Sequence, residues 1–420
     1  MTDAKADLRD ELTGIFLAGV AAADPEAAVD RALKAVPLPV PTPGGRLILL
    51  AVGKAAHGML RAARAHVAPG VDPVCLAVTN YENHAEIPGV RCFAAGHPVP
   101  DENGLRAGAA VARIVADAGE GDHIVALISG GGSALLPAPV EGVTLADKAA
   151  VNRLLLASGA DIEDTNIVRQ ALSTLKGGRL LRMAAPARLR SLILSDVVGD
   201  DLRVIASGPT ISPISDRAGA RAVLERLGVW DQMPQAAKTV LMQDLPRPPL
   251  PKADAALIGS NAISVAAMAQ AAKRDAVQVV APLTGMVGDA ARSVLDVARI
   301  ARPGTAMLFG GETTVIVTGN GRGGRNQELA LRVALLAEEQ GFDGDWMFLS
   351  GGTDGRDGPT DAAGAIVDQN TLTRMRAAGA DPIALLANSD SYAALAASGD
   401  LLMTGATGTN VADLQIFLKL

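Results

Sequence analysis

The chain has 420 residues, about half of them apolar, which is enough for two or three domains with substantial cores. Only 2 Trp, 2 Tyr and 6 Phe occur, so the cores must consist of Ala, Leu, Val and Ile, as in parallel sheets covered by helices. The scarcity of aromatic side chains and the net charge of −7 exclude a general nucleic-acid-binding protein, although a local cationic pocket remains compatible with them.

Two cysteines, Cys75 and Cys92, are too few for a zinc or disulfide framework and are expected to be reduced thiols. The first residues are too charged for a signal peptide, and no apolar run approaches the roughly 18 residues of a membrane span. These features predict a cytoplasmic protein without a membrane partner, and they are compatible with a homo-oligomer.

Short apolar runs alternate with Ala-rich helical segments along the chain. Runs that are apolar on both faces and alternate with helices indicate a mostly parallel sheet covered on both sides. The predicted strands are 46–52, 73–79, 122–129, 191–196, 255–259, 277–281, 313–318 and 346–350. The clearest helices are 103–118, 261–274 and 326–340.

Two proline clusters divide the chain. The first, at 37–43, separates a predicted pair of N-terminal helices from the first strand. The second, at 246–251, is a stiff connector, so we predict domains at 1–245 and 252–420, with the last roughly 30 residues packing back on the first domain. Because ligands of open α/β sheets bind beside the carboxyl ends of strands, we expect the active site in the cleft between the domains.

Lys54 follows the first strong strand and precedes a helix, where backbone N–H groups favour anions. We interpret it as an ammonium group that holds a phosphate or carboxylate, although a lysine taken alone is more often a solvated surface residue. The segment is no Walker A loop, because Ile48 replaces its first glycine and Ala55 follows the lysine.

A glycine-rich loop follows the predicted strand 122–129. Its backbone N–H groups can form a nest for an anion, although a tight strand–helix turn would also use glycine. The candidate phosphate-binding residues are Ser129, Gly130, Gly131, Gly132 and Ser133. Leu135 excludes the G-x-S-x-G nucleophile pattern.

Acidic residues mark two further loops. Asp196 ends a predicted strand and suits Mg²⁺ coordination or a general base, whereas Asp200 and Asp201 fit helix caps equally well. The segment 350–361 is dense in glycine and aspartate, and its Asp354 is a second candidate metal ligand.

The segment 319–324 matches G-x-G-x-x-G, so a dinucleotide site must be weighed. The acidic residues expected about 20 positions later precede the next strand instead of ending it. Arg322 and Arg325 favour an anion clamp, in which Gly321, Gly323 and Gly324 would contact the cofactor. A Ser173-x-x-Lys176 pattern lacks the partners of a serine acyl-enzyme. Together, these loops favour phosphoryl transfer over redox or acyl chemistry.

The loops resemble those of the class II glycerate 2-kinase family, some members of which carry the older label of hydroxypyruvate reductase. The resemblance implies a Rossmann-like N-terminal domain, a smaller C-terminal α/β domain, and phosphorylation of the C2 hydroxyl of D-glycerate with ATP and Mg²⁺. It also implies catalytic roles for the residues at Lys54 and Arg325. Asn80 stands where the family pattern has lysine. The matching segments are 51–59, 95–104, 127–139, 167–180, 195–210, 319–331, 350–365 and 404–414.

We therefore expect Arg325 to anchor the glycerate carboxylate or a phosphate, and Lys54 to neutralise charge on the transferred phosphoryl group. Asp196 would serve as base or metal ligand. An NAD(P)H-dependent hydroxypyruvate reductase that uses the loop 319–324 is the alternative function. A non-enzymatic binding module is disfavoured, because charged loops of both domains are predicted to converge without a large apolar pocket.

Overall fold

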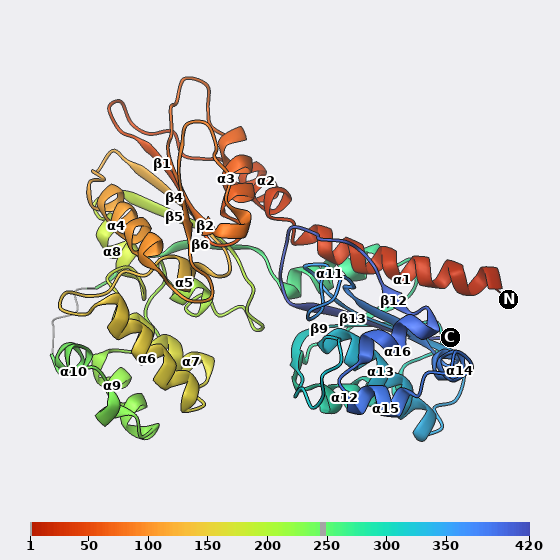
Figure 1. Cartoon of the computed structure of the whole chain (residues 1–420). Coiled ribbons are helices and arrows are strands. Elements are labelled where there is room, and N and C mark those ends of the chain that lie inside the picture. The colour runs from red at the N-terminus through yellow and green to blue at the C-terminus, as the bar shows by residue number, and fades with distance from the viewer. Residues whose placement is uncertain (1, 244–248) are drawn as a thin grey trace. The chain divides into compact units, whose positions relative to one another are not determined.

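The computed structural model describes residues 2–243 and 249–420, and their contacts divide them into two compact units (Figure 1). We call Pro25–Ser195 with Asp200–Ile258 the N-terminal unit. The C-terminal unit contains the chain up to Asp24, the short segment Asp196–Gly199, and Gly259–Leu420.

The N-terminal unit is built on a six-stranded sheet in the order β3-β2-β1-β4-β5-β6. Every pairing from β3 to β5 is parallel, and β1 and β4 are almost entirely apolar and buried. The strand order reverses between β1 and β4, and at such a point the connections on either side lead to opposite faces of the sheet and open a crevice at the strand ends. The strands are β1 (Leu47–Val52), β2 (Val74–Asn80), β3 (Val90–Ala95), β4 (His123–Ile128), β5 (Arg188–Leu194) and β6 (Asp254–Gly259).

Helices cover this sheet and form a second small core. Asp101 caps α4 by accepting a hydrogen bond from the Gly104 N–H, and Thr144 begins α6 in a capping box with Asp147. The apolar faces of α6, α7, α9 and α10 pack on one another. The helices are α2 (Pro25–Ala35), α3 (Ala56–Ala65), α4 (Glu102–Ala116), α5 (Gly132–Leu135), α6 (Leu145–Ala157), α7 (Ile162–Ala171), α8 (Arg179–Ala184), α9 (Arg217–Arg226) and α10 (Gln235–Leu241).

The C-terminal unit contains a mixed sheet in the order β12-β11-β10-β13-β9-β7, with β8 beside β9. Antiparallel pairing joins β12 through to β9, whereas β7 and β8 run parallel to β9. The strands are β7 (Ala276–Gln278), β8 (Leu283–Met286), β9 (Ala306–Thr314), β10 (Trp346–Gly352), β11 (Gly364–Asp368), β12 (Leu401–Leu402) and β13 (Asp413–Lys419).

Each face of this sheet carries its own core. Phe309, Phe348 and Phe417 pack with α12 and α13 on one face, and α1 and α11 cover the other. The helices are α1 (Thr2–Ala22), α11 (Asn261–Ala271), α12 (Val287–Ile300), α13 (Arg325–Glu339), α14 (Thr371–Ala377), α15 (Pro382–Ala387) and α16 (Ser391–Ser398). Among the described helices none is long and apolar enough to cross a membrane alone, and only the bent pair of α1 and α2 passes that test jointly, by length and composition.

The α/β fold and the parallel sheet are confirmed, but the contacts divide the chain differently from the expected domains 1–245 and 252–420. Helix α1 belongs to the C-terminal unit, because Leu12 and Phe16 bury their side chains in its core. Strand β6 belongs to the N-terminal sheet. The last residues form β13, which occupies the middle of the C-terminal sheet.

Two local expectations also change. No strand covers 313–318; the strand in this region, β9, runs from Ala306 to Thr314. The glycines Gly310 and Gly311 interrupt its apolar pattern, so the strand was not recognised from the sequence. Pro246 and Pro248 of the proline connector lie outside the described residues.

Asp122 links the amino-terminal ends of β1 and β4. Its carboxylate accepts hydrogen bonds from the Arg46 N–H at 2.7 Å, the Arg46 guanidinium and the Gly119 N–H. Arg46 holds the pKa of this buried carboxyl at about 2. The carboxylate therefore stabilises the fold above its unfolded pKa near 4, and this contribution is lost as the pH falls toward 2.

Replacing Asp122 by Asn should lower the free energy of unfolding at pH 7 by about 1–3 kcal/mol, because two N–H groups and a guanidinium lose their charged acceptor. Urea unfolding of both proteins checks this value. The difference should be smaller at pH 3 than at pH 7, and an equal difference at both pH values would contradict the ionic origin.

Candidate functional site

The crevice between β1 and β4 brings two predicted loops together. The Lys54 N–H donates to the Gly130 carbonyl at 2.9 Å, and the Ala55 N–H donates to Ser129 Oγ at 3.1 Å. Gly53 has a φ of 126°, and a Cβ there would lie 2.2 Å from Ser129 Oγ. Glycine is therefore required at Gly53 for the two loops to lie side by side.

Lys54 is exposed, and its stem lies against the glycine loop. A Cβ on Gly131, where φ is 80°, would lie 3.2 Å from both Lys54 Cγ and a ring carbon of His97. Burial and the Lys54 charge lower the pKa of His97, which Glu82 opposes. Burial and the neighbouring lysine thus both disfavour the protonated form of His97.

Asn80, which stands in place of the family's lysine, is buried at the end of β2. Its side-chain amide donates to the Glu82 carboxylate. Asn83, three residues after Asn80, donates to the Lys54 carbonyl at 2.9 Å. The segment 79–84, which departs from the family pattern, therefore fixes the backbone of Lys54. It also places the Glu82 carboxylate near Lys54, where the family pattern would supply a second lysine.

A chain of hydrogen bonds runs beneath the glycine loop. Lys176 Nζ donates to Ser133 Oγ at 3.0 Å, and Ser207 Oγ donates to Asn166 Oδ1 at 2.6 Å. Because the Ser207 proton points to Asn166, the 2.8 Å contact between Ser133 Oγ and Ser207 Oγ must use the Ser133 proton. The Ser133 hydroxyl therefore donates its proton within the protein.

Lys176 is a functional candidate that the sequence analysis missed. It is 3% exposed, and no carboxylate in the described part of the chain pairs with it. Burial and the charges of Lys148 and Arg169 place its pKa well below the usual value. Burial likewise lowers the pKa of Lys148 to about 8. The only signal in the sequence was the Ser173-x-x-Lys176 spacing; Ser173 Oγ instead accepts from the Lys176 N–H.

The turn that carries Ser207 is strained. Ala206, Ser207 and Gly208 all have positive φ, between 50° and 60°. Non-glycine residues in this conformation cost of order 1–3 kcal/mol each and persist only where their surroundings hold them. The buried Gln170 supplies that restraint, since its amide donates to the carbonyls of Ser207 at 3.2 Å and Arg203 at 2.9 Å.

Asp196 follows β5 and is half-buried, within the short segment that belongs to the C-terminal unit. Asp201 has a structural role instead, since its carboxylate accepts from the backbone and guanidinium of Arg203. Asp354 accepts from the Arg356 N–H within its own loop at 3.0 Å. Neither Asp196 nor Asp354 belongs to a cluster of three metal-ligating side chains, and no such cluster occurs among the described residues.

Arg325 begins α13 in the C-terminal unit and is fixed by two carboxylates. Nε and Nη2 form a fork with Asp413 at 2.6 and 3.0 Å, and Nη1 contacts Glu312 at 2.6 Å. Asp413 is buried, whereas Glu312 is exposed. These bonds use three of the five N–H groups, so each terminal nitrogen retains one donor for a ligand.

Burial and ion pairing have opposite effects on the pKa values of Arg325 and Asp413. Burial lowers the pKa of Arg325, but Asp413 and Glu312 outweigh this and raise it, so the guanidinium stays charged. Burial raises the pKa of Asp413 to about 6 despite the attraction of Arg325.

Asp357 takes a structural role in the loop 350–361. Its buried carboxylate accepts from the N–H groups of Asn326 at 3.1 Å and Gln327 at 2.8 Å, which are the first unpaired donors of α13. The loop therefore orients the helix that carries Arg325.

The glycines of the segment 319–324 serve close packing. A Cβ on Gly319 or Gly321 would come within 2.4 Å of Asn388 or Asp390, and one on Gly324 would lie 2.2 Å from the Asp357 carboxyl carbon. Arg322 lies over the Tyr392 ring at 5.3 Å and does not join Arg325. The close approach that a pyrophosphate would need is taken by this chain's own residues.

Comparison with known proteins identifies the chain's relatives. The family model "Domain of unknown function (DUF4147)" matches residues 11–242, and the MOFRL family model matches residues 305–413. A D-glycerate 2-kinase of Thermotoga maritima is 42% identical, over 89% of this chain and 90% of its own length. A protein of Agrobacterium vitis with a provisional hydroxypyruvate reductase name is 41% identical, over 98% of this chain and 94% of its own.

The fold agrees with that relationship. The crystal structure of a glycerate kinase from Thermotoga maritima superimposes with a TM-score of 0.90 at 39% identity, covering 99% of this chain and 100% of that one. The resemblance that the loop motifs indicated is thereby confirmed: the chain belongs to the glycerate kinase family.

Proposed function

We propose that this protein transfers the terminal phosphoryl group of ATP to the C2 hydroxyl of D-glycerate, giving 2-phosphoglycerate and ADP. The observation that carries the proposal is the crevice between β1 and β4, where the glycine loop 129–133 and Lys54 meet. Backbone N–H groups and an exposed ammonium at this position suit the phosphates of a nucleotide. The membership of the glycerate kinase family supports the choice of acceptor.

In this proposal the N-terminal unit holds the polyphosphate. The N–H groups of the loop bind its oxygens, and Lys54 offsets the charge that develops on the transferred group. Lys176 lies beneath the loop and fixes Ser133 through its amino group. Burial lowers the pKa of this amino group because a charge is costly to bury, and a bound polyanion would favour its protonated form.

The proposed role of Arg325 is to bind the carboxylate of glycerate with its two remaining donors. Asp413 keeps the guanidinium plane in place, while the exposed Glu312 contacts the Nη1 end that a ligand would approach. The ligand carboxylate would therefore compete with Glu312, and planar recognition of this kind requires arginine.

Mg²⁺ is proposed to arrive with the nucleotide. The described residues hold no three-carboxylate cluster, but nucleotide-bound Mg²⁺ needs only one or two carboxylates, because phosphates and waters complete its shell. Asp196 is the proposed protein ligand, with Asp354 as the second candidate. The ion would supply neutralisation of phosphate charge.

The reductase alternative is disfavoured. It required a dinucleotide at 319–324, where the glycines pack against Asn388, Asp390 and Asp357. These contacts leave no close approach for a pyrophosphate at that loop.

The reaction class can be tested with purified protein, D-glycerate, ATP and Mg²⁺. We expect ADP and a product that enolase consumes directly, because phosphorylation at C2 gives the enolase substrate. A product that needs a mutase first would indicate C3 phosphorylation. Reduction of hydroxypyruvate by NADH without ADP formation would refute the kinase.

Lys54→Met keeps most of the side-chain length but removes the charge. We expect kcat to fall by about 10²–10³, the usual effect of losing one electrostatic contact in the transition state. The melting temperature should stay unchanged, because Lys54 is exposed. Lys34→Met, which removes an exposed lysine paired with Asp30 on α2, is the control and should retain full activity. A rise in KM for ATP with an unchanged kcat would instead show that Lys54 binds ATP equally well in the ground state and in the transition state.

Two substitutions test the Arg325 site in opposite directions. Arg325→Lys keeps the charge but loses the fork, so kcat/KM should fall by about 10²-fold or more. Glu312→Gln weakens a competing, exposed ion pair worth about 0.2–1 kcal/mol, so KM for glycerate should fall up to about fivefold. Steady-state kinetics check both, and a raised KM in Glu312→Gln would show that Glu312 assists the ligand instead.

A further inference from the structure

The side chain of His97 reaches the glycine loop from a distant strand. His97 follows β3 at one edge of the N-terminal sheet, whereas Gly131 follows β4, with β2 and β1 in between. A Cβ on Gly131 would lie 3.2 Å from Cδ2 of the His97 ring and 3.4 Å from Nε2. It would also lie 3.2 Å from Lys54 Cγ. The space beside Gly131 is therefore bounded by the imidazole ring and the lysine stem.

The segment that carries His97 is fixed by Asp101. A Cβ on Gly96 would lie 3.1 Å from the Asp101 carboxyl carbon, so the residue before His97 packs on this carboxylate. The carboxylate also accepts from the Gly104 N–H at 2.8 Å, where it caps α4, and from the Tyr81 hydroxyl. Contacts within the N-terminal unit thus hold the ring beside the glycine loop without any ligand.

The hydrogen-bonding groups of the His97 ring are unused within the protein. The ring is half-buried, and neither of its nitrogens bonds to a described residue or is enclosed by the described residues. Other histidines differ from it, since His66 Nε2 lies 2.9 Å from Asp30. His84 Nε2 likewise lies 3.5 Å from Glu86. Polar groups at partly buried positions are normally hydrogen-bonded, so the His97 ring is suited to a ligand.

The charges around His97 indicate an anion. Burial and Lys54 lower the pKa of the ring, and Glu82 opposes them. The neutral imidazole that these effects favour has one N–H donor and one lone pair. It can therefore donate to a phosphate oxygen without adding a full charge beside Lys54. A phosphate bound there would in turn raise the pKa of His97, because a nearby negative charge favours the protonated ring.

We propose that His97 is a further nucleotide-binding residue, whose Nε2–H donates to a phosphate oxygen bound between the glycine loop and Lys54. Nε2 is the ring nitrogen nearer the loop, since it lies within 4 Å of the Cβ position on Gly131. This role rests on the proposed function, which places the polyphosphate at the same loop. It adds a side-chain donor from the strand at the edge of the sheet.

The proton NMR signals of the histidine rings test this contact directly. The full-length protein is titrated with pH, with and without ATP and Mg²⁺ and in the absence of glycerate, and His97→Gln assigns the signal. We expect ATP to raise the pKa of His97. His123 is the internal reference, because burial likewise lowers its pKa but it lies at the opposite end of β4. Its pKa should not change.

The outcomes separate this contact from the proposed function. An unchanged pKa of His97 in protein saturated with ATP would overturn the contact and leave the nucleotide site intact. No binding of ATP by calorimetry would refute the nucleotide site itself, and the role of His97 with it.

Calorimetric titration with ATP and Mg²⁺ measures what the donor contributes. His97→Phe keeps a flat ring against Gly131 but removes both nitrogens, so Kd should rise about tenfold or more, because a hydrogen bond to a charged group is lost. His97→Gln restores an N–H donor and should recover part of this loss. Equal Kd values for His97→Phe and the natural chain, or equal losses in both variants, would overturn the donor role.

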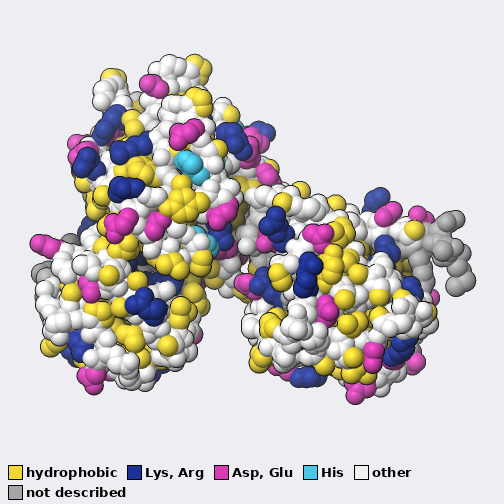
Figure 2. All heavy atoms as spheres, in the orientation of Figure 1, with side chains coloured by type: hydrophobic (Ala, Val, Ile, Leu, Met, Phe, Trp, Pro, Cys, Tyr) yellow, Lys and Arg dark blue, Asp and Glu magenta, His cyan; other side chains and the backbone are white. Residues whose placement is uncertain are grey.

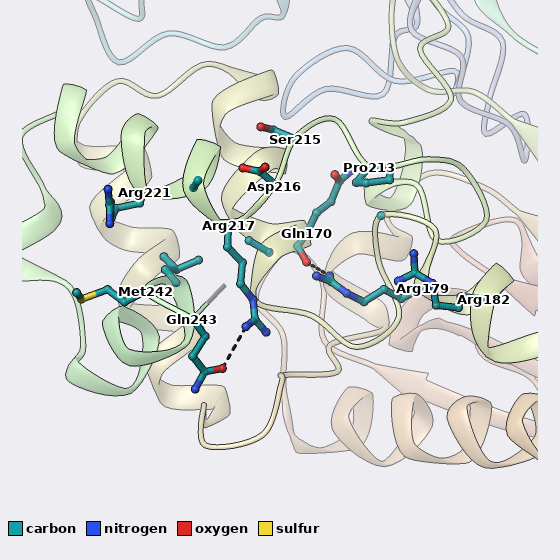
Figure 3. Close-up of a pocket in the computed structure, with 14 residues that line it drawn as sticks. Gln170, Arg179, Arg182, Pro213, Ser215, Asp216, Arg217, Arg221, Met242 and Gln243 are labelled. Atoms are coloured by element: carbon teal, nitrogen blue, oxygen red, sulfur yellow. Dashed lines mark hydrogen bonds between the residues drawn. The ribbon is translucent and has the colours of Figure 1, made fainter. Parts of the chain in front are cut away.

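A separate cavity of the N-terminal unit supplies the control variant (Figure 3). Arg217 lines it and donates to Gln243, as the close-up shows, whereas His97 and Lys54 do not line it. Arg217→Gln removes a positive charge at that cavity. It should leave both the Kd for ATP and the ATP-dependent rise in the pKa of His97 unchanged, and loss of that rise in Arg217→Gln would contradict direct contact.

Discussion

The parallel pairing of β1 with β4 is the constraint on which the N-terminal unit depends. Six residues of each strand lie in register from Leu47 to Val52 and from His123 to Ile128. Because β1 and β4 are parallel neighbours in register, Gly53-Lys54 and the loop after Ile128 begin next to each other. Asp122 fixes the opposite end of the same two strands through Arg46. The position of Lys54 therefore follows from the strand order.

Buried charge organises both units in different ways. In the C-terminal unit, Arg325 is neutralised by Asp413, and Asp357 binds the helix end beside it. Among the residues that the structure describes, Lys176 of the N-terminal unit has only hydroxyl and carbonyl partners. A guanidinium paired with a buried carboxylate is held in one orientation, whereas burial without such a partner lowers the pKa of Lys176.

The surface agrees with a small-molecule enzyme of modest net charge. On the face shown in Figure 2, basic and acidic side chains are interspersed over the coloured residues. Lys176, by contrast, is buried beneath the glycine loop. This distribution favours binding of compact anions over an extended polyanion.

The sequence by itself determined the fold class, most strands and the loops that carry Lys54, Ser129–Ser133 and Arg325. Apolar runs bounded by glycine are local patterns, so they can be recognised from neighbouring residues alone. The division into units required the structure, because the burial of Phe16 and the central place of β13 depend on contacts between segments far apart in the chain.

The same distinction applies to individual side chains. The sequence could not show that Asp357 caps a helix whereas Asp354 does not. It also could not show that Arg322 lies over the Tyr392 ring, apart from Arg325. Lys176 gave no usable local signal, because its burial and its contact with Ser133 span 43 residues of chain. The sequence therefore determined which residue types occupy the loops. Tertiary packing decided which of these side chains bond within the protein, because hydrogen-bond partners are neighbours in space and often lie far apart along the chain.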